Sequence, residues 1–172
     1  MKDVELRLIS ELVKGSRRSD RELAKAIGIS QPTVTRMRGK LEKEGFIKEY
    51  TIVPDFSKLG YSLLAITFVQ LKQALTTEET EKAREKARNS LRENHNEIIM
   101  LERGIGLNRN GVFLSLHKDY SSYLDHRKWL QSFEFLETPD IRTFMIDLND
   151  TVHYRSLGFS TLAKHILTLN GE

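Results

Sequence analysis

A short segment from about Gln31 to Glu44 carries the side chains that proteins use to recognise nucleic acid. At helical spacing, Val34, Met37 and Leu41 fall on one face, which predicts a helix packed on a core. Arginine can bond guanine bidentately, and threonine can donate or accept a hydrogen bond at a base edge. This pattern favours a helix that reads DNA, and the alternative is a charged face that contacts only water. The residues opposite the apolar face are Pro32, Thr33, Thr35, Arg36, Gly39, Lys40 and Lys43, with Arg38 at the margin.

Signals for helix starts and stops predict how this segment is held. Ser19 and Glu22 form an S-x-x-E capping box that opens a first short helix. Gly28 ends that helix, where a left-handed residue is favoured. Ser30 is the predicted N-cap of the second helix, and Pro32 lies in its first turn, where proline loses no hydrogen bond. Two short helices joined by a tight glycine turn, the second of them basic, predict a helix-turn-helix.

Roles within this helix-turn-helix follow from side-chain chemistry. We expect Thr33, Thr35 and Arg36 to read bases, and Arg38 and Lys40 mainly to hold phosphates. The full set of predicted DNA-binding residues is Ser30, Gln31, Pro32, Thr33, Thr35, Arg36, Arg38 and Lys40. Three arginines before the first of the two helices could also touch phosphates or could be solvated: Arg17, Arg18 and Arg21.

The basic charge of the chain lies with this segment. The 172 residues include 27 Lys and Arg against 24 Asp and Glu. Residues 1–50 hold 12 of the basic and 8 of the acidic residues, a net charge of +4, and the remainder carries −1. This distribution is typical of a separate DNA-binding domain. An amphipathic helix at about Lys2 to Lys14 is expected to complete a three-helix core.

The segment after the second helix extends the motif. Apolar residues from Ile47 to Val53 alternate with polar ones, which predicts a short strand stopped by Pro54, the wing or linker of a winged helix-turn-helix. The run GIS-x-x-TV-x-R-x-x-x-L-E-x-E-G-x-I-K-x-Y continues into a D-x-x-K-L-G step from Asp55 to Gly60. Together these residues resemble the Lrp/AsnC family of prokaryotic transcriptional regulators, also called feast/famine regulatory proteins.

A second domain is predicted beyond Gly60. Strands are expected at Tyr61–Leu71, Glu97–Gly104, Val112–His117 and Ile141–Leu148, with helices at about 76–94 and 120–133. The order β-α-β-β-α-β is the ferredoxin-like plan, so the fold class is α+β. A last amphipathic segment, Phe159 to Leu169, carries Leu162, Ile166 and Leu169 on one side. The predicted divisions are 1–54 for the winged helix-turn-helix, 55–60 for a linker, 61–150 for the ferredoxin-like domain and 151–172 for an extension.

A ferredoxin-like module behind a winged helix is the architecture of the Lrp/AsnC family, so the resemblance covers residues 1–150. It implies dimers that form through the C-terminal module, often assembled into octamers, and small effectors, commonly amino acids, bound at the interfaces. A dimer also suits the physics, because a two-fold pair of recognition helices reads a palindromic site. Exposed edges of a four-stranded sheet are likewise best covered by a partner. The predicted partners are duplex DNA, a second copy and an effector.

The effector site is expected in one loop. In the family, the loop between the second and third strands of this module commonly carries a glycine and an acidic residue near the ligand. Here that loop is GIGLNRNG, with Arg109 and no acid. Arg109 could hold a carboxylate, or it could be a solvated turn residue. The candidate effector-binding residues are Gly104, Gly106, Asn108 and Arg109.

No catalytic residues, cofactor or metal site are predicted. The chain has no cysteine, and its histidines, at 95, 117, 126, 153 and 165, show no metal-ligand spacing. One enzymatic alternative stays open, because sirohaem decarboxylases share this plan and place histidines around a tetrapyrrole. Another is an interaction module that has lost DNA binding. Without a signal peptide or a long apolar run, a cytoplasmic protein free of membranes is expected.

Overall fold

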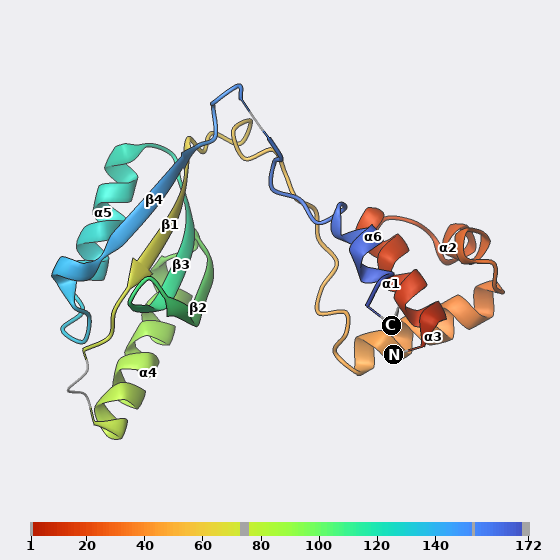
Figure 1. The fold of residues 1–172 in the computed structure, drawn as a ribbon, viewed down its shortest axis with the longest axis horizontal. Helices are drawn as coiled ribbons and strands as arrows, with labels where there is room; N and C mark the ends of the chain where they lie inside the picture. Colours follow the sequence, from red (N-terminus) through yellow and green to blue (C-terminus); the bar gives the residue numbers. More distant parts are fainter. Residues whose placement is uncertain (1, 73–75, 153, 170–172) are drawn as a thin grey trace. The chain divides into compact units, whose positions relative to one another are not determined.

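The computed structural model describes residues 2–72, 76–152 and 154–169, and it divides the chain into two compact units (Figure 1). The first unit combines segments from both ends of the chain, and its described residues are 2–54 and 154–169. The second unit is Asp55–Val152. The predicted C-terminal extension therefore belongs, from Tyr154 on, to the first unit.

Three helices of the first unit share one core. They are α1 (Asp3–Lys14), α2 (Asp20–Ile27) and α3 (Gln31–Lys43). Each buried leucine in such a core contributes about 1.5–3 kcal/mol relative to an exposed one. The predicted three-helix core is confirmed. Its buried members are Leu8, Leu12, Leu23, Ala24, Ile27, Val34 and Leu41.

The helix ends form where the local signals place them. The Ser19 hydroxyl accepts the backbone N–H of Glu22, and the Glu22 carboxylate accepts the N–H of Ser19 at 2.7 Å. Gly28 adopts the left-handed conformation with φ of 76°. The Ser30 side chain accepts the N–H of Thr33 at the start of α3. The predicted caps and turn of the helix-turn-helix are thus confirmed.

The predicted wing strand is wrong. Residues 47–54 contain no strand, although Ile47 packs on the three-helix core. Ile52 is 72% exposed, so the alternation of apolar residues does not correspond to a buried face. A strand needs a partner for its backbone groups. In the described part of the chain no extended segment pairs with this one, and it serves as a connection.

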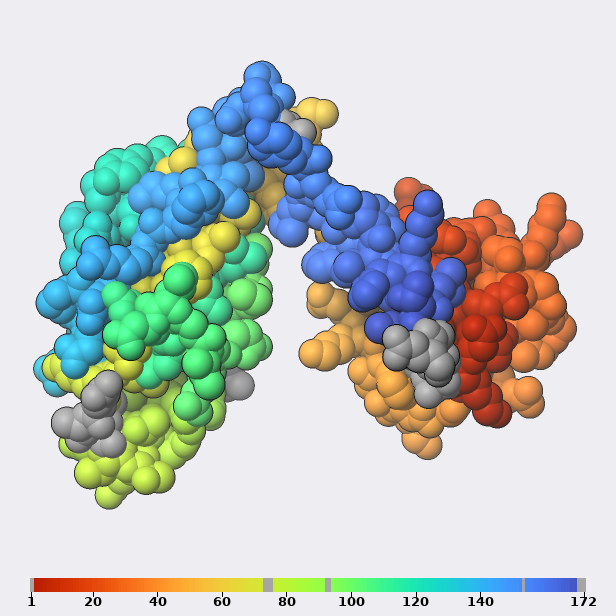
Figure 2. Space-filling view, viewed as in Figure 1, coloured from red at the N-terminus to blue at the C-terminus, as the bar shows by residue number. Residues whose placement is uncertain are grey.

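The C-terminal helix α6 (Leu162–Ile166) packs against α1, as the blue and red segments of Figure 2 show. The Ser10 hydroxyl donates to the backbone carbonyl of Ala163 at 2.7 Å, and each of these residues is 1% exposed. The predicted apolar side of this segment is wrong, because Leu162 and Leu169 are largely exposed. The helix is too short for a full apolar stripe, and a small residue allows close approach to α1.

The second unit is built on a four-stranded antiparallel sheet. Its strands are β1 (Leu63–Val69), β2 (Ile98–Gly106), β3 (Arg109–His117) and β4 (Arg142–Asp147), in the order β2-β3-β1-β4. Ile66 in the central strand lies opposite Leu114 on one side and Phe144 on the other. With one helix after β1 and another after β3, this is the ferredoxin-like arrangement. The predicted α+β fold class is confirmed.

Helices α4 (Thr77–Asn94) and α5 (Tyr120–Gln131) cover one face of this sheet, and the 3₁₀ helix η1 (Thr138–Asp140) precedes β4 (Figure 1). Alternate residues of β1 on this face are buried. On the opposite face, Phe144 is 64% exposed and Ile146 is 37% exposed. The sheet thus has one covered and one open apolar face. The core on the covered face consists of Val69, Phe113, Leu130, Phe133, Leu136 and Ile141.

Candidate nucleic-acid interface

Helix α3 presents a polar face directly opposite its contribution to the core. Val34 and Leu41 are fully buried. The Ser30 and Thr33 hydroxyls lie 2.8 Å apart at the start of the helix. All eight predicted DNA-binding residues lie on α3 or at its N-cap. Of these, Ser30, Gln31, Pro32, Thr35, Arg36 and Lys40 are exposed, whereas Thr33 and Arg38 are half-buried.

Asp20, the first residue of α2, holds two of these side chains. Its Oδ2 accepts the hydroxyl of Thr35 at 2.6 Å. Its Oδ1 lies 2.9 Å from the guanidinium of Arg38, and Nη2 of Arg38 donates to the backbone carbonyl of Arg18 at 3.3 Å. The Arg38 ion pair is largely shielded from solvent, so Arg38 fastens α3 to the start of α2. Arg38 therefore has a structural role that its spacing in the sequence does not indicate.

Lys40 is also paired within the chain. Its Nζ donates to Glu5 Oε1 at 2.7 Å and lies 3.8 Å from Glu44. The hydrogen bond with Lys40 is the main cause that lowers the pKa of Glu5. The same hydrogen bond raises the pKa of Lys40. A phosphate at this position would therefore compete with a carboxylate for the ammonium.

Arg36 is exposed and, among the described residues, has no ion-pair partner. The same is true of Arg21 and Lys25, which lie one turn apart on α2, and of Lys43 near the end of α3. Charges without carboxylate partners are the ones that can neutralise phosphates and release counterions. Lys43 lies on the polar face of α3 that the helical spacing predicts, and Lys25 is an exposed cation on α2 that the sequence pattern did not single out.

The candidate effector loop is a tight hairpin turn. β2 and β3 extend to Gly106 and Arg109, so only Leu107 and Asn108 connect them, with φ of 51° and 54°. This is the conformation of a type I′ hairpin turn. The prediction that GIGLNRNG is the loop is therefore wrong, because all of its residues except Leu107 and Asn108 lie within the two strands.

Arg109 is the most enclosed of the four candidate effector residues. Its Nε donates to the backbone carbonyl of Asp140 at 2.8 Å, and its Nη2 donates to the Asp140 carboxylate at 2.9 Å. Nη1 donates to the carbonyl of Asn108. Because only 10% of this side chain is exposed, the arginine joins the hairpin to η1. It does hold a carboxylate, but one supplied by the chain itself.

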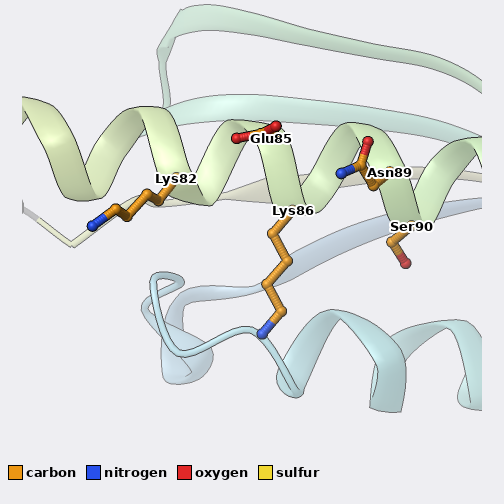
Figure 3. A pocket seen from close by; sticks show the side chains of 5 residues that line it. All are labelled: Lys82, Glu85, Lys86, Asn89 and Ser90. Atoms are coloured by element: carbon orange, nitrogen blue, oxygen red, sulfur yellow. The ribbon is translucent and has the colours of Figure 1, made fainter.

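Helix α4 borders two hollows. A shallow one is lined by polar side chains of this helix alone, and Figure 3 shows Lys86 and Ser90 directed toward α5 and the loop that follows it. Trp129 on α5 donates to the Ser90 hydroxyl at 3.0 Å. The other is a cavity of about 550 Å³ between α4, α5 and the sheet, with walls that include Leu101, Phe113 and Phe133. Its size falls within the range of small-molecule sites.

Comparison with known sequences defines the class of protein. A family model described as winged helix-turn-helix DNA-binding matches residues 1–48. An uncharacterized HTH-type transcriptional regulator of Pyrococcus abyssi is 30% identical over 150 residues, covering 83% of this chain and 95% of that protein. LrpC of Bacillus subtilis is 42% identical over 71 residues, covering 41% of this chain and 49% of LrpC. A regulator of Pyrococcus furiosus is 35% identical over 106 residues, covering 62% of this chain and 66% of that regulator. The chain thus aligns with less than two thirds of the latter two relatives.

Solved structures have the same fold. An AsnC family transcriptional regulator from Agrobacterium tumefaciens superposes with a TM-score of 0.72 at 15% identity, covering 94% of this chain and 99% of the other. The structure of Bacillus subtilis LrpC gives a TM-score of 0.66 at 24% identity, with 90% and 99% covered. At these identities the likeness shows the fold alone.

Fold and helix-turn-helix together define a class, the regulators with a winged helix-turn-helix and a ferredoxin-like module. Within that class, the chain belongs to the Lrp/AsnC family of transcriptional regulators. The three relatives are regulators, and none supports the tetrapyrrole decarboxylase alternative. No helix in the described ranges is long and apolar enough to cross a membrane.

Proposed function

We propose that this protein is a sequence-specific DNA-binding transcriptional regulator that acts in the cytoplasm. The observation that carries the proposal is the exposed face of α3 around Arg36, on the second helix of a fully capped helix-turn-helix. Arg36 would bond a guanine in the major groove, and Thr33 and the residues at the N-cap would contact neighbouring bases. The unpaired cations Arg21, Lys25 and Lys43 would contact phosphates on either side.

A homodimer, or a larger assembly such as an octamer, is part of this proposal. The face of the sheet opposite α4 and α5 carries rows of apolar side chains across three strands, such as Phe144, Ile66 and Leu114. Large apolar areas on a protein surface are typical of interfaces, and a closed two-fold pair buries the same patch on both copies. Two recognition helices would then read a pseudo-palindromic site.

The proposal also includes modulation of DNA binding by a small molecule. A transcriptional regulator of Neisseria meningitidis with this fold was solved as a complex with L-Met. In this chain, the cavity under α4 offers a space of suitable size. The hairpin residues Gly104, Gly106, Asn108 and Arg109 stay candidates, with Arg109 available to a ligand that can displace Asp140.

The experiment is a selection of sites from random duplex DNA, followed by affinity measurements at several salt concentrations. We expect enrichment of a pseudo-palindrome with half-sites about one helical turn apart, or a multiple of that spacing. Arg36→Ala should weaken binding to that site by about 1–3 kcal/mol and relax the preference at one base pair. The control is Lys118→Ala, which removes an exposed basic side chain of the second unit that does not line the cavity.

Two results would contradict the assignment. Arg36→Ala could bind every duplex as the wild type does, while Lys118→Ala weakens binding. Alternatively, selection could enrich no sequence with or without added amino acids, which would favour an interaction module that has lost DNA reading.

A further inference from the structure

Three side chains from separate elements of the second unit meet at one point. His95 is the C-cap of α4, Glu97 directly precedes β2, and His126 lies on α5. Glu97 Oε1 is 2.8 Å from Nδ1 of His95 and 3.3 Å from Nδ1 of His126. One ligand atom from each residue lies within 4.8 Å of the other two. These three residues are referred to as the His–Glu cluster.

The cluster is enclosed but reachable. The side chain of His126 is 1% exposed, whereas those of His95 and Glu97 are 16% and 26% exposed. The indole of Trp129 stacks on His95 with ring centroids 3.9 Å apart. An aromatic wall of this kind limits access of water and fixes the orientation of the imidazole. The partly exposed side chains of His95 and Glu97 leave the cluster open to a small ion on their side.

His126 has an unsatisfied nitrogen. Its Nε2 is buried and has no hydrogen-bond partner in the described part of the chain. The nearby imidazole of His117 does not satisfy it, because Nε2 of His117 is paired with the Ser115 hydroxyl at 2.8 Å. Buried polar atoms without a protein partner are uncommon in native proteins. The two nitrogens of an imidazole point away from each other, so Nε2 does not face Glu97, and an ion held between His126 and Glu97 would bind Nδ1.

We propose that the His–Glu cluster binds a divalent transition-metal ion of the zinc type. Two imidazoles and one carboxylate are a ligand set that Zn²⁺ and Co²⁺ accept, whereas Mg²⁺ and Ca²⁺ prefer oxygen ligands alone. Ligands about 2.0–2.2 Å from a tetrahedral ion lie about 3.3 Å from one another. The separation of Glu97 and His126 fits this value, and Glu97 must withdraw from His95 by about 0.5 Å. Solvent would fill the fourth position.

The ion would fasten α5 to the short connection between α4 and β2, in which His95 and Glu97 lie two residues apart. Among the described side chains, α4 is linked to α5 by the hydrogen bond from Trp129 to Ser90. A metal held by His95, Glu97 and His126 would add to the contacts that Glu97 and His95 already make with α5, next to the cavity that α4 covers. Binding of an ion to the folded state stabilises that state by mass action. The inference does not depend on DNA binding.

Trp129 makes the test direct, because it is the single tryptophan of the chain and contacts the proposed site. Full-length protein without a histidine tag is freed of metal with a chelator and titrated with Co²⁺ and then with Zn²⁺. We expect one equivalent of Co²⁺ to produce the visible absorption of a four-coordinate ion and to quench Trp129. Zn²⁺ should displace this signal and raise the melting temperature, and Mg²⁺ should do neither.

Variants distinguish this site from others. Glu97→Gln keeps the size of the side chain and should weaken Co²⁺ binding at least tenfold, with folding checked by circular dichroism. His165→Ala, which removes an exposed histidine of α6 in the other unit, should bind as the wild type does. The proposal is overturned if excess Co²⁺ produces no absorption and no quenching. It is also overturned if Glu97→Gln leaves the affinity unchanged, and the cluster is then a hydrogen-bond network only.

Discussion

The contact between α6 and α1 allows a direct test of whether the C-terminal helix stabilises the first unit. Ser10 and Ala163 are separated by 153 residues in the sequence, yet the hydroxyl of one donates to the carbonyl of the other at 2.7 Å. Both residues are buried. The variant Ser10→Ala removes the donor, adds no bulk and leaves the Ala163 carbonyl buried without this partner.

The expected magnitude follows from that burial. A buried carbonyl that loses its partner costs about 1–3 kcal/mol, because folding still removes it from water. For a unit of this size, each kcal/mol corresponds to about 4–8 °C in melting temperature. Ser10→Ala should therefore lower the melting temperature of the first unit by roughly 4 °C or more.

The matched control is Ser132→Ala at the end of α5. The Ser132 hydroxyl also donates to a backbone carbonyl, that of Trp129, and again at 2.7 Å, but this bond is exposed. Water replaces the lost donor there, so the change should stay within about 0.5 kcal/mol. Comparing the two variants shows whether the loss of stability depends on burial of the hydrogen bond or only on its presence.

Thermal unfolding followed by circular dichroism, together with hydrogen exchange of residues 159–169, is the assay. We expect these amides to be protected in the wild type and to exchange faster in Ser10→Ala. The reasoning is refuted if the two serine variants melt alike and the same amides exchange in the wild type at the rate of an unfolded peptide.

Two further predictions concern the second unit. Gly111→Ala should destabilise it by about 1–3 kcal/mol in urea titrations, because a Cβ would lie 2.9 Å from Cγ2 of the buried Val69. Gly104→Ala, whose Cβ would meet open space, should have a small effect, and equal losses would contradict the packing argument. Burial lowers the pKa of His126 to about 4, so the unfolded chain binds a proton first as the pH falls. Without metal, the unfolding free energy of the second unit is not reduced by His126 above about pH 6.5. As the pH falls to 5, protonation of this histidine in the unfolded chain lowers that free energy by about 2 kcal/mol. An unchanged urea midpoint between these pH values would contradict this.

Local features of the structure could be predicted from sequence because their causes lie within a few residues. The capping box of Ser19, the left-handed Gly28 and the N-cap of Ser30 each depend on contacts three or four positions away. The core face of α3 follows from helical periodicity, and the βαββαβ order follows from the alternation of strand and helix patterns. The family resemblance of residues 28–60 supplied the architecture, which relatives and solved structures bear out.

Interactions between distant residues decided the rest. Thr35 and Arg38 share Asp20 across two helices, Arg109 reaches Asp140 and Ser10 reaches Ala163. None of these pairs has a spacing that a helix or a strand imposes. The same holds for the wing, because an alternating segment becomes a strand only where a partner pairs with it. Side-chain chemistry and local backbone preference are properties of the sequence. Which charges stay unpaired, and which carbonyls and imidazoles are buried together, depends on how the folded elements pack.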